Sequence, residues 1–268
     1  MTKPFVSVLI PAYNAEKYIS EALQSVLDQT YEEFEIVIID DNSTDTTWEV
    51  IQSFADQDSR IKPYQNEENL KVVQTRNKAF RLASDKAKYY AIMDADDIML
   101  PTRLQRQITF LETNDDYGIV GGDLVLIDEE SKAIKERQYP HTDSEIRQEM
   151  GWRNMIPQPA TTLRAKVIDE LGGYEVGPYD RAQDYELWCR IGTKYKLGNL
   201  RGAVLKYRMF KGQGKYTHLK ETIKSTLRVQ GKYRSEYMNP KSLFLHIAHY
   251  PLLLLPKRFV YWLFRKLS

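Results

Sequence analysis

Four short apolar runs in the first hundred residues most constrain what this chain can fold into. They are FVSVLI (5–10), FEIVIID (34–40), IKPY (61–64) and YYAIMD (89–94). The runs are continuous and rich in β-branched and aromatic residues, which is typical of strands buried on both faces of a parallel sheet. Because the stretches between them have helical spacing, the pattern predicts βαβ units and a doubly wound α/β fold.

The remainder of the chain predicts a less regular half and a tail. We expect helices over RLQRQITFLETN (103–114) and DRAQDYELWCRIGTKY (180–195), with a strand over YGIVGGDLVLID (117–128). We place one domain at residues 1–212, in two halves that meet near residue 100, and a helical extension at 213–268.

Composition excludes several classes of protein. The formal net charge of the 268 residues is +1, which gives no electrostatic case for binding nucleic acid. Cys189 is the single cysteine, so no disulfide can form within the chain. The N-terminal apolar run is short and is stopped by Pro11, which favours a strand over a signal peptide. We therefore expect a protein on the cytoplasmic side of the membrane.

Polar segments follow three of the predicted strands, where doubly wound sheets bind their ligands. These segments are PAYN (11–14), DDNSTDTT (40–47) and DADD (94–97). In the second segment, Asp40 and Asp41 end a strand, and one carboxylate can accept a hydrogen bond from a base or ribose. Ser43 and Asp45 are predicted to cap the next helix.

The DADD segment places Asp94, Asp96 and Asp97 together. Such a cluster must be solvated, raise its own pKa values or hold a cation. Hard oxygen ligands of this kind suit Mg²⁺ or Mn²⁺ together with substrate phosphates. The alternative is a solvated loop that caps a helix beginning at Pro101.

These motifs, in this order, resemble family-two glycosyltransferases, which are nucleotide-sugar-dependent enzymes of the GT-A fold. The resemblance rests on VSVLIPAYNAEKYISEALQSVLDQTYEEFEIVIIDDNSTDTT and on YAIMDADDIMLPTRLQRQ, and covers roughly residues 5–210. It implies a mostly parallel α/β sheet with flanking helices. Residues 1–100 would then bind the nucleotide-sugar and residues 101–212 the acceptor.

The resemblance also implies roles for individual residues. The donor nucleotide-sugar would contact Pro11, Ala12, Tyr13, Asn14, Asp41, Arg76, Asp94 and Asp96. Asp41 resembles the family residue that accepts a hydrogen bond from the N3–H of uracil. This resemblance favours UDP as the donor nucleotide, although dTDP also fits. The alternative role for Arg76 is an ion pair on the protein surface. The family's usual glycines are replaced by Lys71 and Ala79, which leaves the backbone path of that segment open.

Metal binding in the family falls on the Asp-x-Asp motif. Asp94 and Asp96 form that motif, with Asp96 as the leading ligand of Mn²⁺ or Mg²⁺ and Asp94 nearer the ribose. In a second possible alignment of the motif, on residues 95–97, Asp97 binds the metal. Downstream, Phe210 stands where many relatives have a histidine, for which His218, Lys211 or Lys215 could substitute.

A transferase also needs a base, because the acceptor hydroxyl must lose its proton. AQDYELWCRI resembles the family's catalytic segment, with Asp184 as the base, Gln183 in place of the usual glutamate, and Arg190 six residues later. The alternative is that Asp184 only caps a helix beginning at Tyr185. The family mechanism is a single displacement that inverts the anomeric configuration.

The C-terminal segment SLFLHIAHYPLLLLPKRFVYWLFRKLS (242–268) is apolar, aromatic and basic, but has no uninterrupted run long enough to span a bilayer. It predicts an interfacial helix with Phe259, Trp262 and Leu263 in the lipid. Packing on the domain or on a second copy is the alternative. A membrane-surface tail would place the protein on the inner face of the cell membrane and suit a lipid-linked glycan acceptor.

The sequence therefore predicts an inverting, metal-dependent glycosyltransferase. It would move a sugar from a UDP-sugar to a glycan hydroxyl in surface polysaccharide synthesis. One alternative is a catalytically degenerate partner that binds nucleotide-sugar within an assembly complex. A nucleotidyltransferase is a third possibility, disfavoured because PAYNAEKY lacks a glycine-rich phosphate loop.

Overall fold

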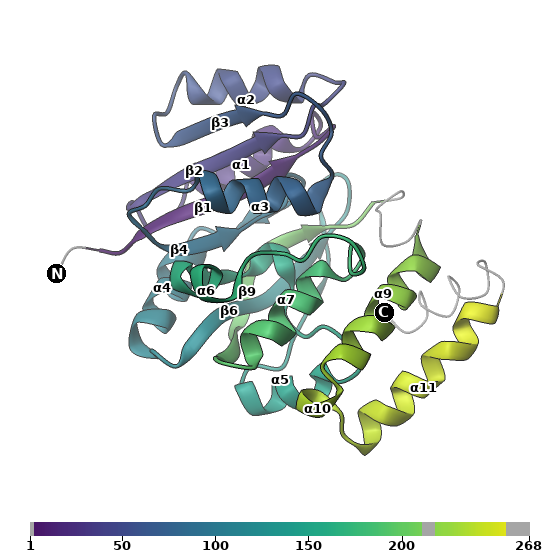
Figure 1. The fold of residues 1–268 in the computed structure, drawn as a ribbon. Helices are drawn as coiled ribbons and strands as arrows, with labels where there is room; N and C mark the ends of the chain where they lie inside the picture. The colour runs from purple at the N-terminus through teal and green to yellow at the C-terminus, as the bar shows by residue number, and fades with distance from the viewer. Residues whose placement is uncertain (1–2, 211–217, 256–268) are drawn as a thin grey trace.

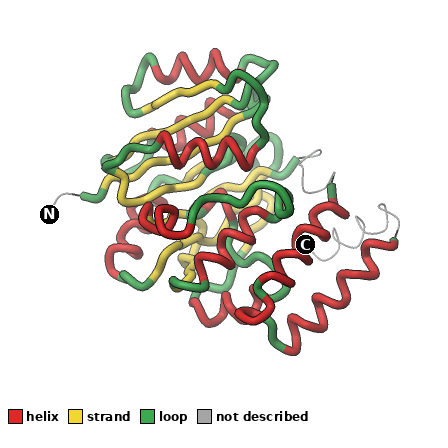
Figure 2. The backbone as a smooth tube through the Cα atoms, viewed as in Figure 1, coloured by secondary structure: helices red, strands yellow, loops and turns green. Residues whose placement is uncertain are grey.

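The fold is built on one twisted sheet with helices on both faces (Figures 1 and 2). The computed structural model describes residues 3–210 and 218–255. The strands are β1 (Phe5–Ala12), β2 (Phe34–Asp40), β3 (Ile61–Gln65), β4 (Ala87–Ile92), β5 (Ile98–Met99), β6 (Tyr117–Ile127), β7 (Ala133–Arg137), β8 (Thr162–Arg164) and β9 (Lys196–Arg208). The helices are α1 (Ile19–Leu27), α2 (Thr47–Ala55), α3 (Val72–Leu82), α4 (Arg103–Thr113), α5 (Asp143–Met150), the short 3-10 turn η1 (Gln158–Ala160), α6 (Ala165–Leu171), α7 (Gln183–Gly192), α9 (Leu219–Lys232), α10 (Arg234–Tyr237) and α11 (Pro240–Leu254).

The strands lie in the order β3-β2-β1-β4-β8-β6-β9-β5, with β7 paired to β6. The first four are parallel neighbours, and β6 and β9 form a second parallel pair. Since β8 lies between β4 and β6 and is antiparallel to both, these six strands point in the same direction. The predicted α/β fold, with a mostly parallel sheet and flanking helices, is confirmed.

Burial on both faces explains why the strands read as continuous apolar runs. Val8 of β1 packs in a cluster with residues of α1, α2 and α4 on one face. Its neighbour Leu9 packs with residues of α3, α6 and α7 on the other face. Every residue of β2 is buried. Successive side chains of a strand point to opposite faces, so both faces here demand apolar residues.

Several local predictions are wrong in detail. Helix α7 begins at Gln183, so Asp184 lies in its first turn and does not cap a helix that starts at Tyr185. Helix α4 begins at Arg103 with Thr102 at its N-cap, so no aspartate of the DADD segment caps it. Ser43 does not cap α2, because its hydroxyl hydrogen-bonds the side chain of Asp40 instead. Asp45 does accept from the backbone N–H of Thr47, at 3.0 Å.

The C-terminal helices α9 and α11 lie side by side in Figure 1, and they pack against α5 and α7 in the second half of the domain. Ile223 and Leu227 of α9 contact Leu252 and Leu253 of α11. Lys241 at the start of α11 pairs with Glu149 at 2.5 Å. Residues 240–254 therefore pack on the domain, which was the alternative to a membrane-surface helix for this part of the tail.

Other parts of the predicted tail cannot be compared. The boundary at residue 212 and the lipid-facing Phe259, Trp262 and Leu263 lie outside the described residues. Within 3–210 and 218–255, no helix combines the length and the apolar character needed to cross a bilayer.

Candidate active site

A cavity of about 560 Å³ opens at the carboxyl ends of β1, β2 and β4. Eight of the predicted donor-binding residues line it, namely Pro11, Ala12, Tyr13, Asn14, Asp41, Arg76, Asp94 and Asp96. We call it the donor cavity. Tyr13 is 49% exposed, which leaves its ring face free to stack on a planar ligand.

The loops after β1 and β2 hold each other in place. Asn14, in the left-handed region at φ 49°, accepts from the backbone N–H of Thr44 at 2.8 Å. Its own N–H donates to the Ser43 hydroxyl at 2.9 Å. Asn14 therefore shapes the cavity through its hydrogen bonds to the neighbouring loop.

The two aspartates after β2 differ in what they bind. Asp40 is fully buried and accepts from Gln65 at 3.0 Å as well as from Ser43. Asp41 accepts from the Asn66 amide at 2.7 Å and from the Leu70 N–H at 2.9 Å, both at Oδ1. Within the described residues Oδ2 of Asp41 has no such partner, and Asp41 alone of the pair lines the donor cavity.

Asp94, Asp96 and Asp97 bring one carboxylate oxygen each within 4.8 Å of the others. Asp97 is 1% exposed, accepts from the Arg208 N–H at 2.9 Å, and leaves Oδ2 buried without a partner. Burial, and then the charge of Asp94, raises the pKa of Asp96 to about 6. Burial followed by the charge of Asp96 raises the pKa of Asp97. Crowded carboxylates with an orphaned oxygen are a donor set that fits Mg²⁺ or Mn²⁺.

Arg208, which sequence reasoning did not single out as an anchor, holds this cluster. It is the last residue of β9 and is fully buried. Its Nε donates to the Asp96 carbonyl at 2.8 Å, and its Nη2 pairs with Glu21 at 2.6 Å. Its guanidinium lies 4.4 Å from the centre of the Tyr18 ring. The only sequence signal was a basic residue at the end of an apolar strand.

A second cavity, also of about 560 Å³, adjoins the first and contains Asp184. The two cavities share Val72, Arg76 and Asp94. Asn154 donates to Asp184 Oδ2 at 2.8 Å, and its own Oδ1 accepts from the Ile156 N–H at 3.0 Å. Burial raises the pKa of Asp184, while the N–H of Tyr185 and the charge of Arg76 oppose that rise. A carboxyl with a raised pKa is a better proton acceptor than an ordinary aspartate.

Arg76 lies between the cavities. Its Nη2 pairs with Asp94 at 2.6 Å. With the Gln183 amide turned to satisfy both of its atoms, Gln183 accepts from Arg76 Nη1 at 3.0 Å and donates to the Asp180 carbonyl. Arg76 is only 7% exposed, so its interpretation as a surface ion pair is wrong.

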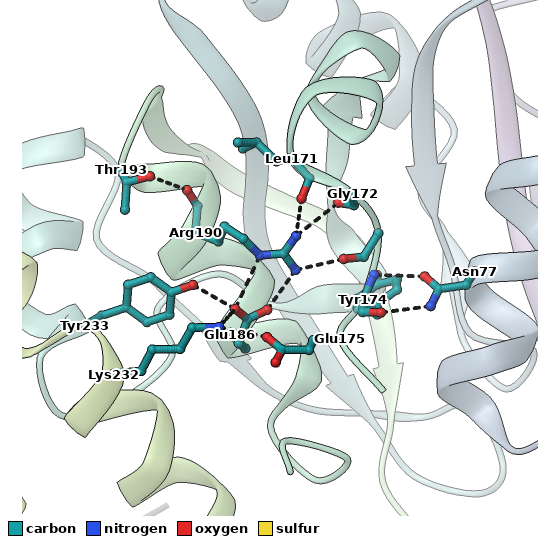
Figure 3. A network of polar contacts seen from close by, with 11 residues as sticks. Asn77, Leu171, Gly172, Tyr174, Glu175, Glu186, Arg190, Thr193, Lys232 and Tyr233 are labelled. Atoms are coloured by element: carbon teal, nitrogen blue, oxygen red, sulfur yellow. Dashed lines mark hydrogen bonds and ion pairs between the residues drawn. The ribbon is translucent and has the colours of Figure 1, made fainter. Parts of the chain in front are cut away.

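A buried network fixes the helix that carries Asp184 (Figure 3). Glu186 of α7 accepts from Lys232 at 2.8 Å and from the Tyr233 hydroxyl at 2.7 Å. Arg190 pairs with Glu186 at 2.8 Å and donates to the carbonyl of Gly173 at 2.7 Å. Arg190 therefore ties α7 to the loop after α6, and Glu186 ties α7 to α9.

The departures from the family pattern now have a structural context. Lys71, where relatives have glycine, has φ 70° and ψ 155°, a conformation that is nearly exclusive to glycine. Ala79 is fully buried in α3. Phe210 lines the donor cavity and lies 6.0 Å from the Tyr18 ring centre. His218 is exposed at the N-cap of α9, and Lys211 and Lys215 are outside the described residues.

The fold is that of the GT-A glycosyltransferases. Residues 7–172 match the family model described as glycosyl transferase family 2. WbnJ from Escherichia coli, an O-antigen biosynthesis glycosyltransferase, is 31% identical over 230 residues, which cover 83% of this chain and 83% of WbnJ. WfaP from Escherichia coli, a UDP-Glc:alpha-D-GlcNAc-diphosphoundecaprenol beta-1,3-glucosyltransferase, is 30% identical over 224 residues, which cover 82% of this chain and 84% of WfaP.

A solved structure agrees. The mannosyltransferase PcManGT from Pyrobaculum calidifontis, in complex with GDP-Man and Mn²⁺, superposes with a TM-score of 0.69 at 18% identity, over 97% of this chain and 72% of that one. The chain therefore belongs to glycosyl transferase family 2, and its relatives include enzymes of polysaccharide biosynthesis.

Proposed function

We propose that this protein is an inverting, metal-dependent glycosyltransferase that moves a sugar from a UDP-sugar to a hydroxyl of a glycan acceptor. The observation that carries the proposal is the pair of adjoining cavities. One is lined by Asp94 and Asp96 of the carboxylate cluster, the other contains Asp184, and Arg76 and Asp94 border both. A sugar at their junction would have the nucleotide on one side and the acceptor on the other.

The donor is assigned from the contacts that the donor cavity offers. Asp41 Oδ2 can accept from uracil N3–H, a proton that cytosine lacks, and Tyr13 can stack on the base. WfaP, which is named as a glucosyltransferase that uses UDP-Glc, supports a uridine nucleotide. Calorimetric titration with UDP, GDP, CDP and dTDP tests this assignment, and UDP should bind most tightly. Equal affinity for CDP would remove Asp41 from base recognition.

The metal would be held by Asp96 and Asp97, with Asp94 close to both. A bound Mn²⁺ or Mg²⁺ supplies positive charge that stabilises the nucleoside diphosphate as it leaves. The chain itself contributes Arg208, which holds the backbone carbonyl of Asp96 and the carboxylate Oδ1 of Asp97 in place. The titration with UDP should therefore be run with and without Mn²⁺.

Asp184 is the proposed base. Its Oδ2 is occupied by Asn154, which leaves Oδ1 for the proton of the acceptor hydroxyl. As Asp184 takes that proton, the acceptor oxygen attacks the anomeric carbon and the bond to the diphosphate breaks. One displacement without a covalent sugar intermediate inverts the anomeric configuration, which NMR of the product measures directly.

The acceptor is proposed to be a lipid-linked glycan used in surface polysaccharide synthesis. WbnJ supports the polysaccharide part of this proposal, because it is an O-antigen biosynthesis glycosyltransferase. WfaP supports the lipid-linked part, because its acceptor is a diphosphoundecaprenol-linked sugar. We assign catalysis to residues 1–212 and membrane attachment to the extension at 213–268, on the cytoplasmic face of the cell membrane.

Helix α11 supplies the structural support for that attachment. Phe244, Ile247, Tyr250 and Leu254 are each more than half exposed, at helical spacing along the side away from α9. The residues that follow include Lys257, Arg258, Arg265 and Lys266. An apolar stripe that is followed in the sequence by basic residues fits a bilayer that contains anionic lipid.

Sedimentation with vesicles of phosphatidylglycerol and phosphatidylcholine tests the tail. The double variant Phe244→Glu/Ile247→Glu should lose most of the bound fraction that the wild-type chain shows. Unchanged sedimentation would reject α11 as the attachment surface, and a dimer that dissociates in the variant would assign the stripe to a second copy instead.

Turnover separates the proposal from a catalytically degenerate nucleotide-sugar-binding partner. UDP-sugars are screened with lipid-linked acceptors, and UDP release is measured. Release that requires both substrates supports the transferase. Tight UDP binding with no release for any pair would favour the binding partner.

A further inference from the structure

Two arginines line the cavity that contains Asp184. Arg137 is the last residue of β7, and Arg181 lies in the loop before α7. Neither forms an ion pair with a carboxylate anywhere in the described part of the chain. Arg137 contacts the Tyr139 hydroxyl, which is neutral at physiological pH. Arg137 is half-buried and Arg181 is exposed, and both guanidinium groups border the cavity without a direct ion-pair partner among the described residues.

The carboxylates of the same cavity are engaged elsewhere. Asp94 pairs with Arg76 at 2.6 Å. Asp180 accepts from the Gly177 N–H at 2.9 Å. Asp184 accepts from Asn154 and from the N–H groups of its own helix. At least one oxygen of each carboxylate is held by such a contact, and in the described part of the chain none of the three forms an ion pair with Arg137 or Arg181.

A third arginine adds to the charge near Arg137. Burial, and to a smaller extent the nearby charge of Arg137, lowers the pKa of Arg153. Arg153 packs 4.3 Å from the Trp152 ring centre and has only a 3.7 Å contact with Glu149. Gathering like charges costs free energy unless an anion is bound among them. A guanidinium also presents a planar fork of donors that matches phosphate and carboxylate oxygens.

We propose that the second cavity recognises an acceptor that carries an oxyanion, a phosphate or carboxylate group, through Arg137 and Arg181. This inference rests on the proposed function, since it places the acceptor hydroxyl at Asp184. The anion could come from a phosphate ester that joins the sugar to a lipid, or from an acidic sugar within the glycan. Tyr139 and Tyr207 line the same cavity and offer ring faces to the sugar between the anion and the base.

The test uses matched acceptors with the full-length protein and the UDP-sugar that it accepts. One monosaccharide is presented as a neutral alkyl glycoside, as an alkyl diphosphate ester, and as the alkyl glycoside of its uronic acid. Wild-type kcat/KM should be at least about tenfold higher for one anionic form than for the neutral form, which is the scale of one charged hydrogen bond. Preference for the diphosphate assigns a lipid-linkage phosphate, and preference for the uronic acid assigns an acidic sugar.

Variants then assign the preference to the two arginines. Arg137→Ala and Arg181→Ala should each lower the anionic-to-neutral ratio of kcat/KM by about tenfold. Arg81→Ala is the matched control, because Arg81 is an exposed arginine of α3 that lines neither cavity. A ratio that is the same in all four proteins would overturn the inference.

A binding measurement keeps this result separate from failure of the proposed function. Inorganic phosphate is titrated into protein saturated with UDP and Mn²⁺, so that the donor cavity is filled. Phosphate should bind wild type and the Arg81→Ala variant, and bind Arg137→Ala and Arg181→Ala at least about tenfold more weakly. If UDP binds and neutral acceptors are used as well as anionic ones, the function stands and the inference is wrong. If the enzyme transfers sugar to none of the acceptors, the phosphate titration decides the inference by itself.

Discussion

The donor cavity and the second cavity, which we propose binds the acceptor and call the acceptor cavity, adjoin each other but are built in different ways. The donor cavity forms where β1, β2 and β4 end, and half of its residues come from the short segments that follow those strands. Most of the others belong to the end of β1 and to α3 with the loop before it. The acceptor cavity takes Arg137, Asn154, Asp184 and Thr222 from segments far apart in the chain. Sheet topology therefore positions much of the donor cavity, whereas the second cavity is assembled from strands, helices and loops that are far apart in the chain.

The supports of the two sites differ in the same way. On the donor side, one arginine, Arg208, fixes the cluster, because its Nε donates to the carbonyl of Asp96 and its backbone N–H donates to the carboxylate of Asp97. On the acceptor side, the position of Asp184 depends on side-chain contacts, from Asn154 directly and from Glu186 through α7. A site held by side chains can change with few substitutions, which suits a pocket that must select among acceptors.

The largest effect should come from the acceptor side. Asp184→Asn should lower the rate of sugar transfer about 10²–10⁴-fold, because the amide cannot take the proton of the acceptor hydroxyl. UDP affinity should stay unchanged, since Asp184 is absent from the donor cavity. Steady-state transfer and UDP calorimetry measure the two quantities.

Asp180→Asn is the control for that variant. Asp180 lines the same cavity, but its carboxylate accepts from the Gly177 N–H and lies outside the proposed reaction. If Asp180→Asn abolished transfer while Asp184→Asn spared it, the base would be misassigned.

On the donor side, Asp96→Asn should weaken UDP binding in the presence of Mn²⁺ by at least about 100-fold, because one metal ligand is lost. In metal-free protein the same change should raise the melting temperature, since it removes one of three crowded carboxylates. Calorimetry and thermal unfolding without metal measure both effects. The exposed Asp85→Asn serves as control, and UDP binding by Asp96→Asn that kept its Mn²⁺ dependence would reassign the metal ligand.

The same contrast explains what could be predicted from the sequence. The four strands, the segments at their ends and the donor-cavity residues were predictable, because buried strands have a strong apolar signature and ligands bind beyond their carboxyl ends. Asp184 came from a motif, but Asn154, Glu186 and Arg137 did not. Their roles depend on tertiary contacts between segments dozens of residues apart, such as the 46-residue separation of Lys232 and Glu186.

A smaller effect should separate positioning from catalysis at the acceptor site. Asn154→Ala should lower kcat about tenfold, the scale of one hydrogen bond to a charged group. The lost N–H stabilised the ionised carboxylate, so the pKa of Asp184 should rise further and the acid limb of the pH–rate profile should move to higher pH. The other charged or titratable groups near Asp184 are Arg76, Tyr174, Asp180, Arg181 and Cys189.

Asn154→Asp should move the acid limb in the same direction, because it places a second carboxylate beside Asp184. UDP affinity should not change in either variant. A uniform loss of rate with an unmoved pH profile would mean that Asn154 supports the loop only, through the Ile156 N–H.

The smallest effect should test the donor-side backbone. Lys71 lines the donor cavity in a conformation that costs a non-glycine residue about 1–3 kcal/mol. Lys71→Gly should recover part of that cost, offset by about 0.5–1 kcal/mol of added freedom in the unfolded chain. A net gain of about 1 kcal/mol would raise the melting temperature by about 2–4 °C for a domain of this size. Lys71→Ala is the sharp control, because it removes the long side chain but keeps the Cβ atom and hence the strain. If alanine stabilised the protein as much as glycine, the gain would come from the lysine side chain and not from the backbone.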